Sequence, residues 1–167
     1  WGLAWLSGQA PALSIVATVV ILDLAIYAQH WFFHRNQLCW RLHMIHHVDL
    51  DIDVTTGARF HPVEILLSMV IKMILVLSIG APVAGVVAFE ILLNATSLFN
   101  HGNVRIASGI DRLLRWVVVT PDMHRVHHSV LPQETFSNFG FNLPWWDRLF
   151  GTYRPQPREG HAGMSIG

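Results

Sequence analysis

The segment from residue 11 to residue 34 reads PALSIVATVVILDLAIYAQHWFFH. Its first ~20 residues are mostly apolar, with Asp23 the only charge among them, and they are long enough for a helix to cross ~30 Å of hydrocarbon. The segment then becomes aromatic and basic, with Trp31, Phe32 and, just beyond it, Arg35. Such side chains favour the boundary between membrane and water. The pattern therefore predicts a transmembrane helix over residues 11–34 that leaves the membrane near Arg35.

A second apolar region follows, and it is interrupted at residues 80–82, which read Gly-Ala-Pro. Glycine and proline together end a helix, so we expect a hairpin of two helices over residues 63–79 and 83–99. Each is at the short end of spanning length, ~17 residues. Lys72 and Glu90 lie inside these helices, where charge is costly in lipid, so they either snorkel or face a neighbouring helix.

The composition supports one membrane domain. The chain has 167 residues and only 13% charged residues, about half the usual share of a soluble domain, which is ~25%. Lys+Arg and Asp+Glu are equal at 11 each, so no charge excess favours nucleic acid. We expect an all-α membrane bundle, with residues 1–167 forming a single domain and residues 100–155 forming a cytosolic cap.

The arginines indicate the topology. All of them lie in residues 35–59 or 105–158, and none lies at the 80–82 turn. If the chain crosses the membrane three times, every arginine is on one side. The positive-inside rule makes that side cytoplasmic.

Histidine is unusually frequent, with 11 residues. Eight of them form three clusters: His30 and His34; His43, His46 and His47; His124, His127 and His128. Residues three and four apart share one face of a helix, so each cluster can direct two or three imidazoles to one place. Neutral imidazole binds first-row transition metals, and eight exceed the four ligands of a tetrahedral zinc. The clusters therefore predict a site for two metal ions.

Two further histidines lie between these clusters. His101 follows Asn100 at the end of the hairpin, at the membrane level expected for His34, and we expect it to be a ninth ligand. His61 directly precedes a predicted helix. It either caps that helix or contributes to the metal site.

Acidic residues are candidates for orienting the ligands, because metal-bound histidines usually donate their second N–H to a carboxylate or carbonyl. Asp23 lies on the histidine-bearing face of the first helix, with Asp122 and Asp49 as alternatives. Thr120 and the following Pro-Asp are typical of a helix start, which predicts a helix over residues 121–130. Asp122 therefore equally fits simple stabilisation of that helix.

The sequence resembles the fatty acid hydroxylase/sterol desaturase superfamily of membrane di-iron oxygenases over about residues 20–155. The matching motifs are the three histidine clusters, Asp23-x-x-x-Tyr27-x-x-His30, Arg59-Phe60-His61-Pro62-Val63-Glu64, Phe99-Asn100-His101, Asn138-Phe139-Gly140, and the run from Trp146 to Tyr153 that reads WDRLFGTY. Members carry further membrane helices before the first cluster. Since the chain opens with Trp1 and not with methionine, we expect an N-terminally truncated member.

The resemblance implies two non-haem irons held by the eight clustered histidines and His101. It also implies O₂ as co-substrate, and a lipid or sterol whose C–H bond is hydroxylated or desaturated. The chain carries no haem or flavin motif, so an external electron donor of the ferredoxin or cytochrome b5 type is expected. The alternative is a membrane metal-binding protein or transporter without oxygenase activity.

Overall fold

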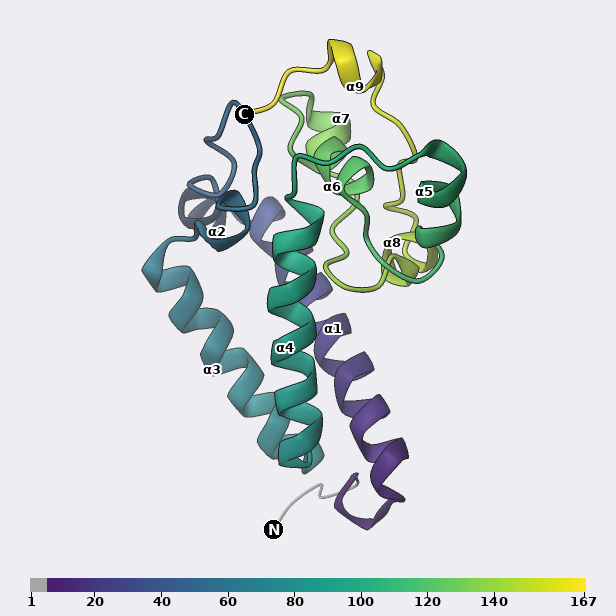
Figure 1. Ribbon diagram of the computed structural model, residues 1–167. Coiled ribbons are helices and arrows are strands. Elements are labelled where there is room, and N and C mark those ends of the chain that lie inside the picture. Colours follow the sequence, from purple (N-terminus) through teal and green to yellow (C-terminus); the bar gives the residue numbers. More distant parts are fainter. Residues whose placement is uncertain (1–5) are drawn as a thin grey trace.

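The computed structural model describes residues 6–167 and is built from helices (Figure 1). Trp1, which suggested a truncated start, lies outside the described residues. Three helices are long and apolar enough to cross a membrane: α1 (Pro11–Arg35), α3 (Pro62–Ile79) and α4 (Val83–Asn100). This confirms the all-α membrane fold class. Each helix begins and ends within one residue of its predicted bounds.

Local sequence signals set the ends of the α3–α4 hairpin. Pro62 occupies the first position of α3, where its missing N–H costs nothing, and the ring of His61 accepts a hydrogen bond from the N–H of Val63. The structure thus confirms the capping interpretation of His61. At the other end, Gly80 has a φ of 64° and ends α3 in the left-handed conformation that glycine favours.

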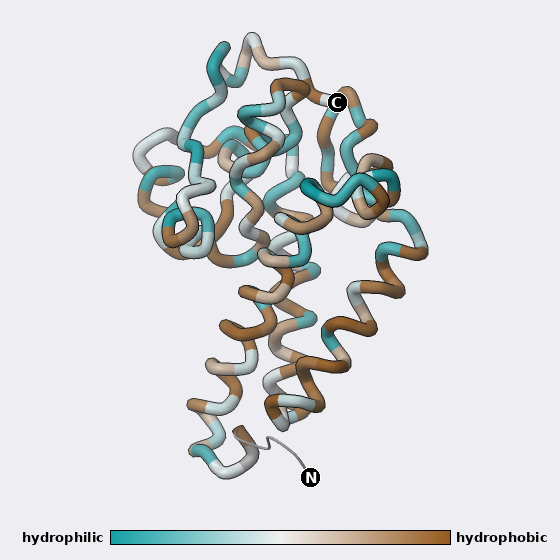
Figure 2. Tube along the Cα trace, turned by 180° about the vertical axis from the view of Figure 1, so that it is seen from behind, coloured by the Kyte–Doolittle hydropathy of each residue, from teal (hydrophilic) through white to brown (hydrophobic). Residues whose placement is uncertain are grey.

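Shorter elements build a cap at the end of the bundle opposite the Gly80 turn, and Figure 2 shows that polar residues are concentrated there. They are α2 (Gln37–His43), η2 (Thr56–Ala58), α5 (Ser108–Leu114), α6 (Pro121–His127), α7 (Pro132–Thr135), α8 (Trp145–Leu149) and α9 (Gly160–Gly163), while η1 (Leu6–Gly8) precedes α1. The helix predicted over residues 121–130 is α6, capped by Thr120 as expected but ending at His127. The helix ends there because the N–H groups of His128 and Ser129 bond to the carbonyls three residues back, those of Arg125 and Val126, and no longer to those four residues back.

α1 and α4 pack closely against each other. A Cβ added at Gly85 of α4 would lie 2.8 Å from Cβ of Thr18 on α1, so the two backbones approach where a side chain would not fit. Above this contact, Leu22, Ile26 and Phe89 are buried together with Phe141 of the cap. This core holds the cap against the two helices.

α3 diverges from α4 between the turn that joins them and the cap (Figure 1). Glu64 is its one residue in the buried class among those described. Lys72 of α3 forms an ion pair of 2.5 Å with Glu90 of α4, which confirms that these charges face a neighbouring helix. Such pairing lowers the cost of charge at membrane depth.

Candidate metal centre

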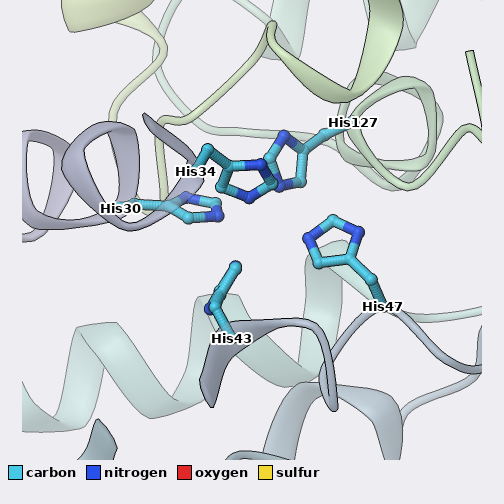
Figure 3. Close-up of side chains that lie close together, drawn as sticks. All are labelled: His30, His34, His43, His47 and His127. Carbon is cyan, nitrogen blue, oxygen red and sulfur yellow. The ribbon is translucent and has the colours of Figure 1, made fainter. Parts of the chain in front are cut away.

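The nine predicted ligands come together in two adjacent groups at the cap end of the long helices. The first histidine group contains His30, His34, His43, His47 and His127, and the second contains His46, His101, His124 and His128. Within each group the candidate ligand nitrogens lie within 4.8 Å of one another. Figure 3 shows the five rings of the first group turned toward a common centre.

The spacing within each cluster decides which group a histidine joins. The pairs four residues apart stay together: His30 with His34 and His43 with His47 in the first group, and His124 with His128 in the second. The histidine three residues after the start of an H-x-x-H-H cluster joins the other group, as His46 and His127 do. Each of these clusters therefore contributes to both groups. This agrees with the expectation that a cluster directs two or three imidazoles to one place, because two histidines of each cluster share a group and the third joins the other.

The local backbone explains this division for the second cluster. α2 ends at His43, and residues 44–47 form a turn. His46 and His47 are neighbours in that turn, with ring centroids 5.5 Å apart and planes at 89°. Adjacent side chains leave the backbone in different directions, so one reaches each group.

Hydrogen bonds from Nδ1 fix the orientation of several rings. Nδ1 of His30 donates to the carbonyl of Phe139 at 2.9 Å, and Nδ1 of His127 donates to the carbonyl of Ser137 at 2.8 Å. A carbonyl only accepts, so in these rings Nδ1 carries the proton and Nε2 carries a lone pair. The Nε2 atoms of both histidines are buried without a partner. Unpartnered lone pairs in a buried site are what metal ligands require.

The second group gives a sharper test of whether a cation fits. Nδ1 of His46 donates to the carbonyl of Arg59, and Nδ1 of His101 donates to the carbonyl of Ser97. Both Nε2 atoms therefore present lone pairs, yet they lie only 3.1 Å apart. Two lone pairs at this distance repel each other unless a cation lies between them. The donor set fits a bound metal ion.

Burial keeps the rings neutral. Each of the nine histidines exposes 4% or less of its surface. Because the charged form loses its hydration, burial lowers the pKa of His101 to about 4 and that of His43 to about 3. Burial also lowers the pKa values of the histidines of the third cluster, His124, His127 and His128. Neutral imidazole is the form that coordinates metals.

Glu64 belongs to a motif that carries the family resemblance, but the sequence analysis assigned it no role in the site. Its Oε1 accepts a hydrogen bond of 2.7 Å from Nδ1 of His43, and its side chain is buried. The available signal was an acidic residue in the first turn of a helix next to a histidine-rich segment. That signal is equally typical of helix stabilisation, and the pairing with His43 joins residues 21 apart in sequence.

None of the three acids considered for orienting the ligands, Asp23, Asp122 and Asp49, contacts a histidine through the hydrogen bonds found in residues 6–167. Asp49 accepts from the hydroxyl of Thr56 and the guanidinium of Arg59. Asp23 accepts from the backbone N–H groups of Asn142 and Leu143 and from the indole of Trp146. It ties the cap to α1. Asp122 forms an ion pair of 2.8 Å with Arg125 in the first turn of α6.

A cavity of about 700 Å³ lies between α3 and the other two long helices and reaches the first histidine group. Most of its wall is apolar. Its polar lining residues include Gln29, His30, His43, Ser68, Lys72 and Glu90. Glu64, Ser68 and Lys72 are spaced by four on α3, and each bonds to a different element: α2, α1 and α4 respectively. Three polar links thus hold α3 across an otherwise apolar space.

Comparison with known proteins adds independent information. A family model described as fatty acid hydroxylase matches residues 15–152. An ornithine lipid hydroxylase, OlsE, of Rhizobium tropici is 30% identical over 162 residues, which is 97% of this chain and 48% of the relative.

Two alkylglycerol monooxygenases are also similar. The Xenopus tropicalis protein is 28% identical over 89% of this chain and 32% of its own length, and the Homo sapiens protein is 27% identical over 86% and 31%. The chain thus spans between about a third and a half of the length of these relatives. No solved structure matches it significantly.

Proposed function

Because the chain belongs to the fatty acid hydroxylase family, we propose that it is a membrane di-iron enzyme that uses O₂ to hydroxylate a C–H bond of a lipid. The observation that carries this proposal is the pair of buried, nitrogen-only histidine groups at the mouth of an apolar cavity. The nine histidines of the two groups hold the metals. An all-imidazole set suits iron, copper, nickel or zinc, and family membership selects iron.

The irons, when bound, supply the activation of O₂ that attack on an unactivated C–H bond requires. The chain contributes position. Carbonyls and Glu64 fix five of the nine ligand rings through Nδ1, so the Nε2 of each of these rings is oriented before metal arrives. Burial excludes water from the histidine groups.

The cavity favours a membrane lipid as substrate. Its walls include all three candidate membrane helices, α1, α3 and α4, so a hydrocarbon chain can enter from the bilayer without passing through water. Its volume lies within the ~300–1,000 Å³ range of ligand sites. The relatives' names, an ornithine lipid hydroxylase and an alkylglycerol monooxygenase, support a lipid with a polar headgroup over a sterol.

The same names favour hydroxylation over desaturation. In hydroxylation, one atom of O₂ enters the C–H bond and the other leaves as water, which consumes two electrons and two protons. We assign the electrons to an external donor of the ferredoxin or cytochrome b5 type. The arginines at the cap end support a cytoplasmic site, where such donors are available.

Lipid mass spectrometry under isotopically labelled oxygen gas tests the proposal. Membranes containing the full-length protein are expected to accumulate a lipid that carries one labelled oxygen atom, whereas the His124→Ala variant yields none. Metal analysis of the purified protein should give two irons per chain. A protein that binds zinc alone, or that carries metal into vesicles without oxidising lipid, would establish the non-oxygenase alternative.

A further inference from the structure

The cap carries a patch of apolar side chains outside the two histidine groups. On α5 and just after it, Ile110, Leu113 and Trp116 are each more than half exposed. On α8 and just after it, Leu149 and Phe150 are likewise more than half exposed. Isolated apolar residues are common on surfaces, but a contiguous group marks an interaction surface.

Several contacts join α5 and α8 into one surface. The indole N–H of Trp145 donates to the carbonyl of Trp116 at 2.6 Å, and the guanidinium of Arg148 donates to the carbonyl of Arg115 at 2.9 Å. The Arg148 guanidinium also lies 4.3 Å above the Trp116 ring and 4.1 Å above the Tyr153 ring. Figures 1 and 2 both show α5 and α8 side by side at one edge of the cap. We call this unit the α5–α8 face.

The α5–α8 face lies beside α1, at a depth that can be estimated along that helix. Phe150 stacks on Tyr27 with centroids 5.5 Å apart, and Trp146 hydrogen-bonds to Asp23. At 1.5 Å per residue, Tyr27 and Asp23 lie about 12 and 18 Å below Arg35 along α1. Even if the top two turns of α1, about 11 Å, project above the hydrocarbon, Tyr27 lies at its boundary and Asp23 below it.

We propose that the α5–α8 face is a membrane-docking surface that inserts into the boundary between headgroups and acyl chains, in the leaflet next to the histidine groups. Its chemistry matches that environment. Leu113 and Leu149 supply apolar contact, tryptophans are suited to the interface, and the exposed Arg112 beside Leu113 can pair with lipid phosphate. An interfacial helix of this kind buries its apolar face about 5–10 Å deep.

This arrangement has a consequence for the whole molecule. The cap then contacts the bilayer directly through the α5–α8 face, in addition to its connections to α1 and α4. The depth of the histidine groups is set by two separate contacts with lipid: the spanning helices and the α5–α8 face. This inference stands whether or not the protein is an oxygenase.

Spin labelling of single cysteines tests the proposal. The free Cys39 is first replaced by serine, and Leu113→Cys or Leu149→Cys then carries a nitroxide in the full-length protein. The protein is reconstituted in equimolar phosphatidylcholine and phosphatidylglycerol vesicles. Collision rates with O₂, which concentrates in lipid, and with a water-soluble nickel complex are compared. Leu77→Cys on α3 is the reference for lipid exposure, and Gln133→Cys in the cap is the reference for water.

We expect the ratio of O₂ to nickel collisions at both α5–α8 positions to be severalfold higher than at Gln133→Cys and to approach that at Leu77→Cys. A ratio equal to that of Gln133→Cys would show that the face is in water and would overturn the proposal. Low collision rates with both reagents would show instead that protein covers the face, either a second copy or another segment of the full-length chain. That result would overturn it as well.

Discussion

Nδ1 of His43 donates a hydrogen bond of 2.7 Å to Oε1 of Glu64, which links α2 to the first turn of α3. It connects the first histidine group with α3, which forms one wall of the cavity. A carboxylate at this position fixes the tautomer of the ring and raises the basicity of its Nε2. The position of α3 and the geometry of the first histidine group are therefore coupled.

Replacing Glu64 with leucine is expected to weaken metal binding at the first group by about 10–100-fold, the usual effect of removing such a partner. Glu64→Gln keeps an acceptor oxygen and should lose less. Metal affinity is measured by competition with a chelator. Glu159→Gln, on the exposed surface of the cap, is the control and should bind metal normally. Equal affinity in Glu64→Leu and the unaltered protein would show that the hydrogen bond does not orient His43.

His46 and His127 each join a different group from the other histidines of their cluster. This arrangement predicts how many metal ions single-histidine variants retain. His127→Ala removes a ligand from the first group and His46→Ala removes one from the second. His127→Ala should lose chiefly the metal of the first group, and His46→Ala chiefly the metal of the second. Elemental analysis gives the number of metals that each variant retains. A metal-sensitive spectrum shows whether the retained metal lies in the same site in the two variants.

His61→Ala is the matched control for these two variants. It removes a helix cap, not a ligand, so it should keep both metals and lose about 1 kcal/mol of stability. Loss of both metals in His127→Ala with no change in His46→Ala would contradict the two-group arrangement.

The long helices could be predicted from sequence because hydropathy and the Gly-Ala-Pro interruption are local signals. The histidine spacing was informative for the same reason, and the eight histidines that it indicated lie together in the structure with His101, which was predicted from its place at the end of the hairpin. The division of each H-x-x-H-H cluster between two groups was not predictable. It depends on α2 ending at His43 and on helices that are distant in the chain.

Residues that act through long-range contacts were assigned less well. Asp23 shares a helical face with His30, which suggested that it orients a ligand. Its partners are instead Asn142, Leu143 and Trp146, about 120 residues away, and no periodicity in the sequence points to them. Glu64 was missed because its pairing with His43 depends on how α3 docks.

Gly57 permits a close approach that supports the second group. A Cβ at this position would lie 2.7 Å from the carbonyl oxygen of Ser97 and 3.1 Å from Nδ1 of His101. Gly57→Ala should therefore displace the end of α4, cost about 1–3 kcal/mol through overpacking, and weaken metal binding at the second group. Thermal unfolding and metal titration measure the two effects. Gly109→Ala, where the added Cβ meets nothing within 4 Å, is the control and should be neutral or slightly stabilising.

The depressed pKa values of the histidines predict how the metal-free protein responds to acid. The pKa of His101 is about 4 in the folded protein and ~6.5 in an unfolded chain. Between these values the unfolded state binds more protons, so the free energy of unfolding decreases as pH falls from about 6.5 toward 4. Above pH 6.5 both states are neutral and this dependence disappears.

Thermal unfolding of the metal-free protein in nanodiscs, followed between pH 8 and pH 4.5, measures this dependence. The control is His101→Gln, which should show a shallower loss of stability with acid. An unfolding midpoint that rises as pH falls would mean that the histidines are more basic in the folded protein, contrary to their burial.

Asp23→Ala tests whether this carboxylate holds the cap or orients a ligand. The substitution leaves the N–H groups of Asn142 and Leu143 and the indole of Trp146 without their acceptor. The cost is about 1–3 kcal/mol for the buried N–H of Asn142 and less for the two half-buried donors. We expect faster hydrogen exchange at Asn142 and Leu143 and a lower unfolding midpoint. Metal binding under saturating iron should persist, since His30 is held by the carbonyl of Phe139. A variant with unchanged exchange but weaker metal binding would instead assign Asp23 to the orientation of a histidine.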